Sequence, residues 1–218
     1  MIKAIIFDFD GVILESANIK TEAFRELFCD YPEKIEEITD YHLLNTGISR
    51  YVKFRHIYGR ILGKKLTKKE EARLGERFSH LAFRKVLKTP FVSGARGFLG
   101  QNKQRYQFFV ASGTPQEELD NIIQFRKLRG YFKEVHGSPK EKADIINHII
   151  KDYNFGRHEI VFLGDGASDR IAAKKAKIIF IERTVSYKKP KGQWAMNNFF
   201  DLGMVLNKIE KLNLKEGD

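Results

Sequence analysis

The sequence predicts an α/β protein with a parallel sheet flanked by helices and a helical insertion after the first strand. The apolar run that begins at Met1 and ends at Phe7 is typical of a strand buried on both faces. From residue 106 onward, apolar strand patterns alternate with helical ones, as expected where right-handed crossovers join parallel strands. Between these two regions, from residue 17 to about residue 88, no strand pattern is strong.

Each expected element follows from a local pattern. In the insertion, apolar residues at helical spacing predict helices over residues 19–28, 48–61 and 74–86, and the charged segment 64–73 predicts an exposed hairpin between the last two. After Pro90 the same criteria predict helices over 92–99, 116–127, 139–150 and 197–212, and strands over 106–111, 132–136, 160–164 and 178–182. Ser138-Pro139-Lys140-Glu141 has the pattern of a capping box with proline at the first helical position.

The composition limits the classes of protein that need to be considered. The chain has 218 residues, of which 42% are hydrophobic, enough for one large domain or a core with an insertion. No apolar run approaches the roughly 20 residues of a membrane span, and no secretion signal is recognisable. The single cysteine, Cys29, excludes an internal disulfide and suits a reducing, cytoplasmic compartment. We therefore expect no membrane partner.

The net charge of +11 permits a nucleic-acid partner, but the distribution of the charge argues against one. The basic residues are scattered among acidic ones, and runs such as Lys64-Lys65 and Lys188-Lys189 are typical of solvated helix faces and loops. No nucleic-acid-binding motif accompanies them. A positive field would also attract an anionic substrate, which is the interpretation we favour.

Polar side chains follow three of the predicted strands, at the point where each strand ends. Asp8 and Asp10 follow the first strand, Ser112 ends another, and Asp165 with Asp169 follows a third. Because the carboxyl ends of parallel strands meet at one edge of a sheet, these groups should converge there. Closely spaced carboxylates repel one another and need a cation between them, and an oxygen-rich set without thiols suits Mg²⁺.

Such a site is suited to a phosphate. A metal ion and a lysine neutralise phosphoryl charge, and a carboxylate can attack phosphorus in line. Gly11 lets the backbone turn just after the first strand. Gly113 and Thr114 expose backbone N–H groups at the start of a helix, which makes a natural anion cradle.

The ordered set of motifs resembles the haloacid dehalogenase (HAD) superfamily of aspartate-nucleophile phosphohydrolases. The segments that carry the resemblance are Asp8-Phe9-Asp10-Gly11-Val12, Val110-Ala111-Ser112-Gly113-Thr114 and Gly164-Asp165-Gly166-Ala167-Ser168-Asp169. The layout is similar to the subfamily that contains phosphoglycolate phosphatase and β-phosphoglucomutase. The resemblance implies a Rossmann-like HAD core at residues 1–15 and 90–218, and a helical cap at residues 16–89.

The resemblance also implies roles for individual residues. Asp8 would attack phosphorus, and Asp10 would protonate the leaving oxygen and then activate water. Mg²⁺ would be held by Asp8, by the backbone carbonyl of Asp10, by Asp165 and, directly or through water, by Asp169. Ser112 would bind the phosphoryl group, next to Gly11, Gly113 and Thr114. An acid/base at residue 10 argues against a dehalogenase, because dehalogenases of this family lack one.

Two lysines compete for the remaining motif of the family. Lys140 fits members with a lysine four residues before an acidic residue, and Lys142 fits members with a lysine two residues before it. Both spacings to Asp165 are acceptable. The sequence favours Lys142 and leaves Lys140 open.

The cap should contact the leaving group of the substrate. The polar candidates are Glu15, Asn18 and Lys20 where the insertion begins, and Arg50, Lys53 and Arg55 in its second helix. They predict a polar or anionic substrate such as a phosphorylated sugar or sugar acid, and the alternative is an ordinary basic helix face. The six histidines show no metal-ligand spacing.

These observations favour a Mg²⁺-dependent phosphatase that acts on a small phosphorylated metabolite. One alternative is a phosphomutase, in which a bound sugar rather than water takes the phosphoryl group. Another is a nucleic-acid-associated protein without turnover, against which the acidic motifs argue. A phosphonate hydrolase would need a Schiff base on Lys20, and no other feature supports it. The sequence does not indicate an oligomeric state.

Overall fold

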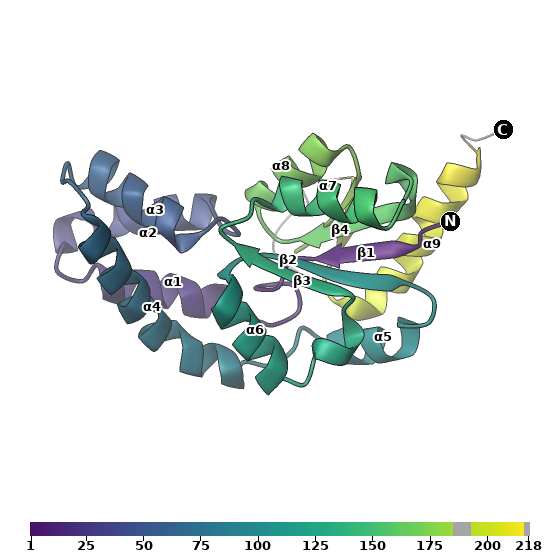
Figure 1. Ribbon diagram of the computed structural model, residues 1–218, viewed down its shortest axis with the longest axis horizontal. Coiled ribbons are helices and arrows are strands. Elements are labelled where there is room, and N and C mark those ends of the chain that lie inside the picture. Colours follow the sequence, from purple (N-terminus) through teal and green to yellow (C-terminus); the bar gives the residue numbers. More distant parts are fainter. Residues whose placement is uncertain (185–192, 216–218) are drawn as a thin grey trace.

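The computed structural model describes residues 1–184 and 193–215, so the predicted solvated run Lys188-Lys189 lies outside the described residues. Its centre is a six-stranded, all-parallel sheet with strand order β3-β2-β1-β4-β5-β6 (Figure 1). The strands are β1 (Ala4–Phe7), β2 (Gln107–Pro115), β3 (Glu134–Ser138), β4 (Ile160–Gly164), β5 (Ile179–Arg183) and β6 (Trp194–Met196). The predicted parallel α/β architecture is confirmed.

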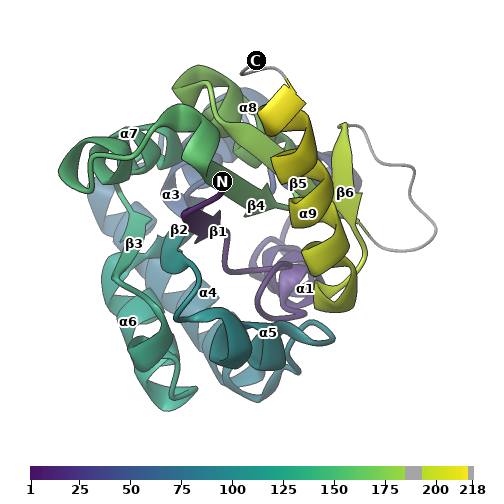
Figure 2. The same ribbon diagram turned by 90° about the vertical axis from the view of Figure 1, so that its right-hand side faces the viewer.

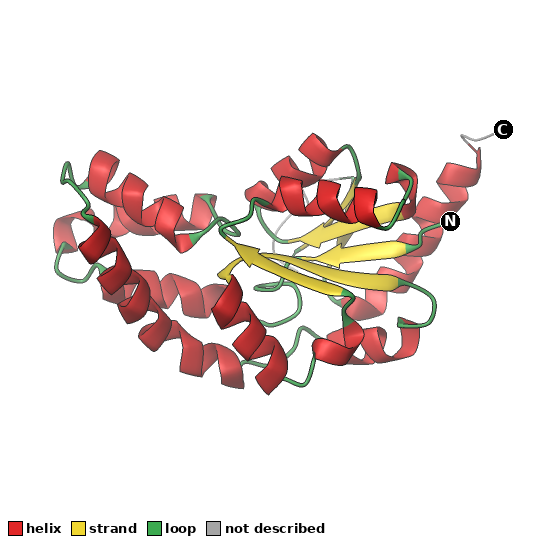
Figure 3. Cartoon of the chain, viewed as in Figure 1, coloured by secondary structure: helices red, strands yellow, loops and turns green. Residues whose placement is uncertain are grey.

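Helices cover both faces of the sheet, as Figures 2 and 3 show. Ile5 and Phe7 of β1 pack into a core shared with α5 (Ala95–Asn102), α6 (Gln116–Phe125) and α9 (Phe199–Lys215). Ala4 and Ile6 point to the other face, which is covered by α7 (Lys142–Asp152) and α8 (Ala167–Ala176). Alternation along the strand therefore explains why the first strand is apolar at every position. Short 3₁₀ turns at Arg129–Tyr131 and Arg157–Glu159 precede β3 and β4.

The insertion after β1 is helical, as predicted, and lies beyond the carboxyl ends of the strands (Figure 1). It comprises α1 (Ala17–Leu27), a 3₁₀ turn (Pro32–Lys34), α2 (Ile35–Leu44), α3 (Arg50–His56), a π-helical turn (Ile57–Ile61) and α4 (Lys68–Lys88). Its own core contains four fully buried phenylalanines, Phe24, Phe28, Phe54 and Phe78. We call this insertion the cap and the remainder the core.

Two local predictions were wrong. Residues 68–73 are not a hairpin but the first turns of α4, because Thr67 and Glu70 form a capping box that begins the helix there. Conversely, Ser138 does not cap a helix: it ends β3, and α7 begins at Lys142 without a side-chain cap. Helix α2 and strand β6 were not predicted. No helix in the described part of the chain is long and apolar enough to cross a membrane.

Candidate active site

The candidate site begins at the carboxyl ends of the three central strands. Phe7 of β1 lies opposite Val110 of β2 and Leu163 of β4, so the residues that follow these strands meet at one edge. The Asp8 N–H donates to the carbonyl of Leu163 over 2.8 Å, which continues the sheet ladder and fixes the backbone of Asp8. The sequence therefore brings Asp8 to the centre of the edge, as predicted.

Three carboxylates converge at this edge. Asp8, Asp165 and Asp169 each offer an oxygen, and these oxygens lie within 4.8 Å of one another. Asp8 and Asp169 are buried and Asp165 is half-buried. Burial raises the pKa of Asp8 and, together with the nearby Asp169, raises the pKa of Asp165 to about 7. A hard divalent cation would relieve this repulsion, and the all-oxygen donor set fits such an ion.

Lys142 lies between two of these carboxylates. Its Nζ is 2.9 Å from Asp8 Oδ1 and 2.5 Å from Asp169 Oδ1, and the side chain is buried. Burial alone would lower the pKa of Lys142, but Asp169 and Asp8 outweigh it and raise the pKa above its usual range. Lys140 is exposed in the loop before α7. The structure thus brings Lys142, and not Lys140, to the carboxylates.

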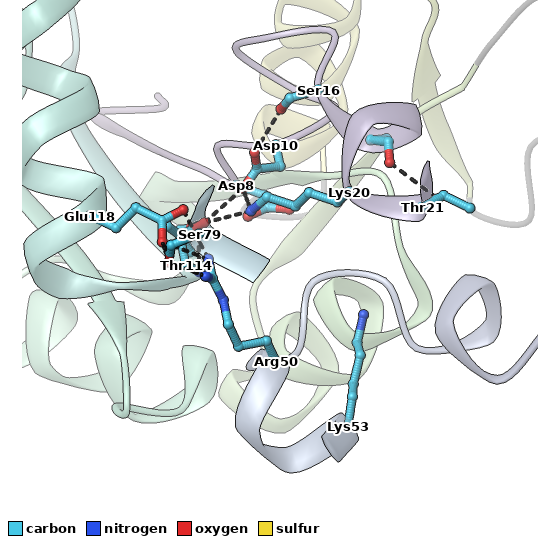
Figure 4. Close-up of polar contacts among 12 residues, drawn as sticks. Asp8, Asp10, Ser16, Lys20, Thr21, Arg50, Lys53, Ser79, Thr114 and Glu118 are labelled. Carbon is cyan, nitrogen blue, oxygen red and sulfur yellow. Dashed lines mark hydrogen bonds and ion pairs between the residues drawn. The ribbon is translucent and has the colours of Figure 1, made fainter. Parts of the chain in front are cut away.

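Asp10, beside the carboxylate cluster, is held by a network of its own (Figure 4). Its Oδ1 accepts a hydrogen bond from Ser16 Oγ over 2.6 Å, and its Oδ2 accepts one from Thr114 Oγ1 over 2.8 Å. Lys20 forms an ion pair with the same Oδ2 and donates to Thr114. Burial opposes ionisation of Asp10, but Lys20 and these hydrogen bonds together lower its pKa. Asp10 is therefore a carboxylate in this arrangement.

Two glycines let backbone segments approach closely. Gly11 has φ +75°, and a Cβ there would come within 2.1 Å of an Asp165 carboxylate oxygen. A Cβ on Gly113 would lie 2.4 Å from the carbonyl oxygen of Gly47. The cap loop at Gly47 therefore rests directly on the end of β2, which contains Gly113 and Thr114, so the helix start predicted for these two residues was wrong. Beside it, the Ser112 hydroxyl accepts the Thr114 N–H over 3.1 Å.

Cap and core enclose a cavity of about 50 Å³. The core contributes Asp8, Asp10, Gly113, Thr114 and Asp165, and the cap contributes the basic residues Lys20, Arg50 and Lys53. Other candidates from the sequence lie elsewhere. Glu15 forms an ion pair with Arg183, Asn18 is exposed, and Arg55 pairs with Glu71 on the surface of the cap.

Lys53 is a buried cation without a carboxylate partner among residues 1–184 and 193–215. Its Nζ lies 3.1 Å from His42 Nδ1 and 5.3 Å from the centre of the Phe24 ring. Burial and the charge of Lys20 lower the pKa of Lys53 to about 7. Burial and Lys53 likewise lower the pKa of His42 to about 3, which keeps the ring neutral. Sequence reasoning missed His42, because the helix that carries it was not predicted.

Comparisons with known proteins agree on the fold and on one family. Residues 2–177 match the family described as haloacid dehalogenase-like hydrolase. No curated protein sequence matches the chain. Among solved structures, β-phosphoglucomutase from Clostridium difficile has a TM-score of 0.77 at 17% identity, covering 98% of this chain and 100% of that one.

Two further solved structures resemble the chain over nearly its whole length. One is a predicted phosphatase from Clostridium acetobutylicum, with TM-score 0.74, 18% identity and 95% and 99% of the two chains covered. The other is a predicted phosphoglycolate phosphatase from Haemophilus somnus 129pt, with TM-score 0.73, 18% identity and 94% and 98% covered. At these identities, the likeness shows a shared fold.

Proposed function

Because the chain belongs to the haloacid dehalogenase-like hydrolases, we propose that it is a Mg²⁺-dependent phosphatase of a small phosphomonoester that forms an aspartyl-phosphate on Asp8. One observation carries the proposal. Asp8 is fixed at the centre of the sheet edge, beside Lys142, two further carboxylates and the cavity. The proposed nucleophile Asp8, the positive charge of Lys142 and a candidate cation site thus all lie beside the cavity.

The proposed first step transfers the phosphoryl group to Asp8. A carboxylate oxygen of Asp8 attacks phosphorus, the ester P–O bond breaks, and the leaving oxygen takes a proton from Asp10. In the second step, the Asp10 carboxylate removes a proton from water, and the water oxygen attacks phosphorus. The bond between phosphorus and the Asp8 oxygen breaks, which releases inorganic phosphate and restores the Asp8 carboxylate. Water and the phosphate ester are the only reactants, and Asp10 regains its proton in the second step.

Mg²⁺ is the cation that the donor set fits best. It would be held by the carboxylates of Asp8, Asp165 and Asp169 together with the backbone carbonyl of Asp10. When bound, the ion neutralises charge on the phosphoryl group. Lys142 would neutralise charge on the same group, and Ser112 with the N–H group of Gly113 would orient it.

Asp10 is ionised in this structure, so it must take up a proton before it can protonate the leaving oxygen. Lys20 lowers the pKa of Asp10, so Asp10 lacks a proton while Lys20 stays bound to it. A substrate phosphoryl group that attracts Lys20 away from Asp10 would let the carboxyl group take up the proton that the first step needs. Lys20 would then act as a positioning residue for the acid/base, which replaces the Schiff-base role considered from the sequence.

The cap favours a substrate with a second polar or anionic group. Lys53 and Arg50 face the cavity from α3, and Lys53 forms no ion pair with a carboxylate of the described residues. The cavity of about 50 Å³ is far smaller than the roughly 300–1,000 Å³ of a pocket that holds a small-molecule ligand. We therefore infer that the cap opens to admit a phosphorylated sugar or sugar acid and closes on it.

A phosphomutase is the second candidate. The observation that favours it is the likeness to β-phosphoglucomutase together with the tight contact of Gly47 with Gly113, which restricts water once the cap is closed. A mutase would need a bisphosphate for turnover and would return a phosphorylated sugar, whereas a phosphatase would release inorganic phosphate. Phosphate release measured with and without a sugar bisphosphate separates the two.

The proposed function is tested with p-nitrophenyl phosphate and a panel of sugar phosphates, phosphoglycolate and nucleotides, with Mg²⁺ or EDTA. We expect Asp8→Asn to lower kcat by more than about 10⁴-fold with the fold intact. Lys142→Met should also inactivate the enzyme, whereas the matched exposed variant Lys140→Met should retain activity. Unchanged turnover in Asp8→Asn would exclude the nucleophile, and full activity in EDTA would exclude the metal.

A further inference from the structure

A second cluster of ligating side chains lies at the edge of the sheet, outside the candidate active site. Glu134 and His136 are two residues apart on the edge strand β3, so they point to the same face. Helix α7 covers that face and presents His148 to them (Figure 2). The two histidines are twelve positions apart in sequence, a spacing that does not by itself indicate a metal site.

The ligand atoms of this cluster converge on one carboxylate oxygen. Glu134 Oε2 lies 2.6 Å from His136 Nε2 and 3.3 Å from His148 Nε2. One ligand atom from each residue lies within 4.8 Å of the others. Ligands about 2.0–2.1 Å from a tetrahedral metal ion are separated by about 3.3 Å, so Glu134 Oε2 and His136 Nε2 would need to move apart by less than about 1 Å to hold one.

Neighbouring groups orient the ligands. Asp152 Oδ2 lies 3.4 Å from His148 Nδ1, and Tyr153 donates its hydroxyl to the other oxygen of Glu134 over 3.0 Å. A carboxylate near the second ring nitrogen is the usual partner of a metal-bound histidine, because accepting that N–H would fix the tautomer with Nε2 free.

We propose that Glu134, His136 and His148 form a binding site for a divalent transition-metal ion of the Zn²⁺ type. Two imidazole nitrogens and one carboxylate oxygen are a ligand set that Zn²⁺ prefers and Mg²⁺ does not. The side chains are 14% (His136), 27% (Glu134) and 41% (His148) exposed, so an ion can enter from solvent and keep water in the open position. The site differs in ligand chemistry from the all-carboxylate cluster.

The bound ion would join β3 to α7. Helix α7 also carries Lys142 at its first residue, so the ion would fix the helix that presents this lysine to Asp8. Binding to the folded state alone also raises the free energy of unfolding in proportion to the logarithm of metal concentration. We expect a structural role, since neither histidine lines the candidate active site.

The experiment is a titration of the full chain with Zn²⁺, and with Co²⁺ as a spectroscopic probe, in excess Mg²⁺ to fill the carboxylate site. The wild-type protein should bind one Zn²⁺ with a rise in Tm, and Co²⁺ should give the visible absorption of a nitrogen-ligated ion. His136→Gln and His148→Gln should each weaken Zn²⁺ binding by more than about tenfold. His80→Gln, an exposed histidine on α4, is the matched control and should bind as wild type.

The Asp8→Asn variant separates this proposal from the proposed function, because it should lose phosphatase activity and keep the Zn²⁺ site. Equal Zn²⁺ affinity in wild type, His136→Gln and His148→Gln would overturn the proposal, and so would no binding in wild type. Loss of Zn²⁺ binding in Asp8→Asn would also overturn it, by placing the ion at the carboxylates. Metal-free melting curves of the variants show that each one folds.

Discussion

Arg50 of the cap forms a buried ion pair with Glu118 of the core, with 2.8 Å between Arg50 Nη2 and Glu118 Oε2. Ser79 on α4 accepts a hydrogen bond from Arg50 and donates one to Glu118, so three helices meet at this pair (Figure 4). The guanidinium also lies 4.4 Å from the centre of the Phe78 ring. This contact joins α3 and α4 of the cap to α6 of the core beside the cavity.

Glu118→Gln should therefore destabilise the protein. It leaves the buried charge of Arg50 without its counter-charge, and breaking a buried pair in this way costs about 3 kcal/mol. The free energy of unfolding from urea titration measures the loss. Arg55→Gln removes the exposed pair with Glu71 and should change stability by less than about 1 kcal/mol. Equal losses in the two variants would contradict a special role for the Arg50–Glu118 pair.

The stability of the metal-free protein should fall as pH rises from about 4 to 7. Burial and Asp169 raise the pKa of Asp165 to about 7, whereas an unfolded aspartate titrates near about 3.9. Across this window the folded protein binds more protons than the unfolded chain, so the free energy of unfolding decreases with pH. Urea titrations in EDTA should show this slope, and Asp165→Asn should reduce it.

Mg²⁺ should reverse that trend, since it binds the ionised carboxylates. Added Mg²⁺ should increase the free energy of unfolding more at pH 8 than at pH 5. The same increment at both pH values, or no increment in wild type, would contradict a cation site at these carboxylates.

Lys20→Met should raise the pKa of Asp10, because Lys20 is the largest of the influences that lower it. If the first step needs protonated Asp10, the basic limb of kcat/KM against pH should move to higher pH in this variant. The profile is measured with p-nitrophenyl phosphate, and Lys85→Met, which changes an exposed lysine, is the control. If the basic limb of kcat/KM lies at the same pH in Lys20→Met and in the wild type, Lys20 does not control the protonation of Asp10.

Lys53→Met should separate substrate recognition from chemistry. Methionine keeps the contact with Phe24 and removes the charge, so kcat/KM should fall for substrates with a second anionic group and stay similar for p-nitrophenyl phosphate. The variant should also gain stability below about pH 7, since burial lowers the pKa of Lys53 to about 7 and the folded wild type disfavours the charged amine there. Equal losses of kcat/KM on both kinds of substrate would argue against recognition by Lys53.

The sequence was sufficient to predict the sheet edge that carries the acidic residues. Asp8 and Asp165 each follow an apolar strand buried on both faces, and Ser112 lies directly after the apolar part of a third. Such strands are recognisable without knowledge of their neighbours. The family resemblance predicted from the same motifs is confirmed by the match over residues 2–177. The helical insertion after β1 is also confirmed.

Contacts between distant segments could not be predicted in the same way. The choice of Lys142 over Lys140 depends on where α7 begins, and the proline pattern at Ser138 indicated a start that was too early. The pairing of Arg50 with Glu118 depends on how the cap docks on α6. Such contacts arise from packing between elements, about which local periodicity carries no information.

The central claim, a phosphoryl group carried by Asp8, is tested most directly by trapping it. The enzyme is mixed with substrate and Mg²⁺, quenched in acid, and treated with borohydride, which reduces an aspartyl-phosphate to homoserine. Mass spectrometry of the peptide that contains residue 8 should then find homoserine at that position, and none when substrate is left out or in Asp8→Asn. An unmodified Asp8 during active turnover, or a phosphoryl group found on another residue, would contradict the account.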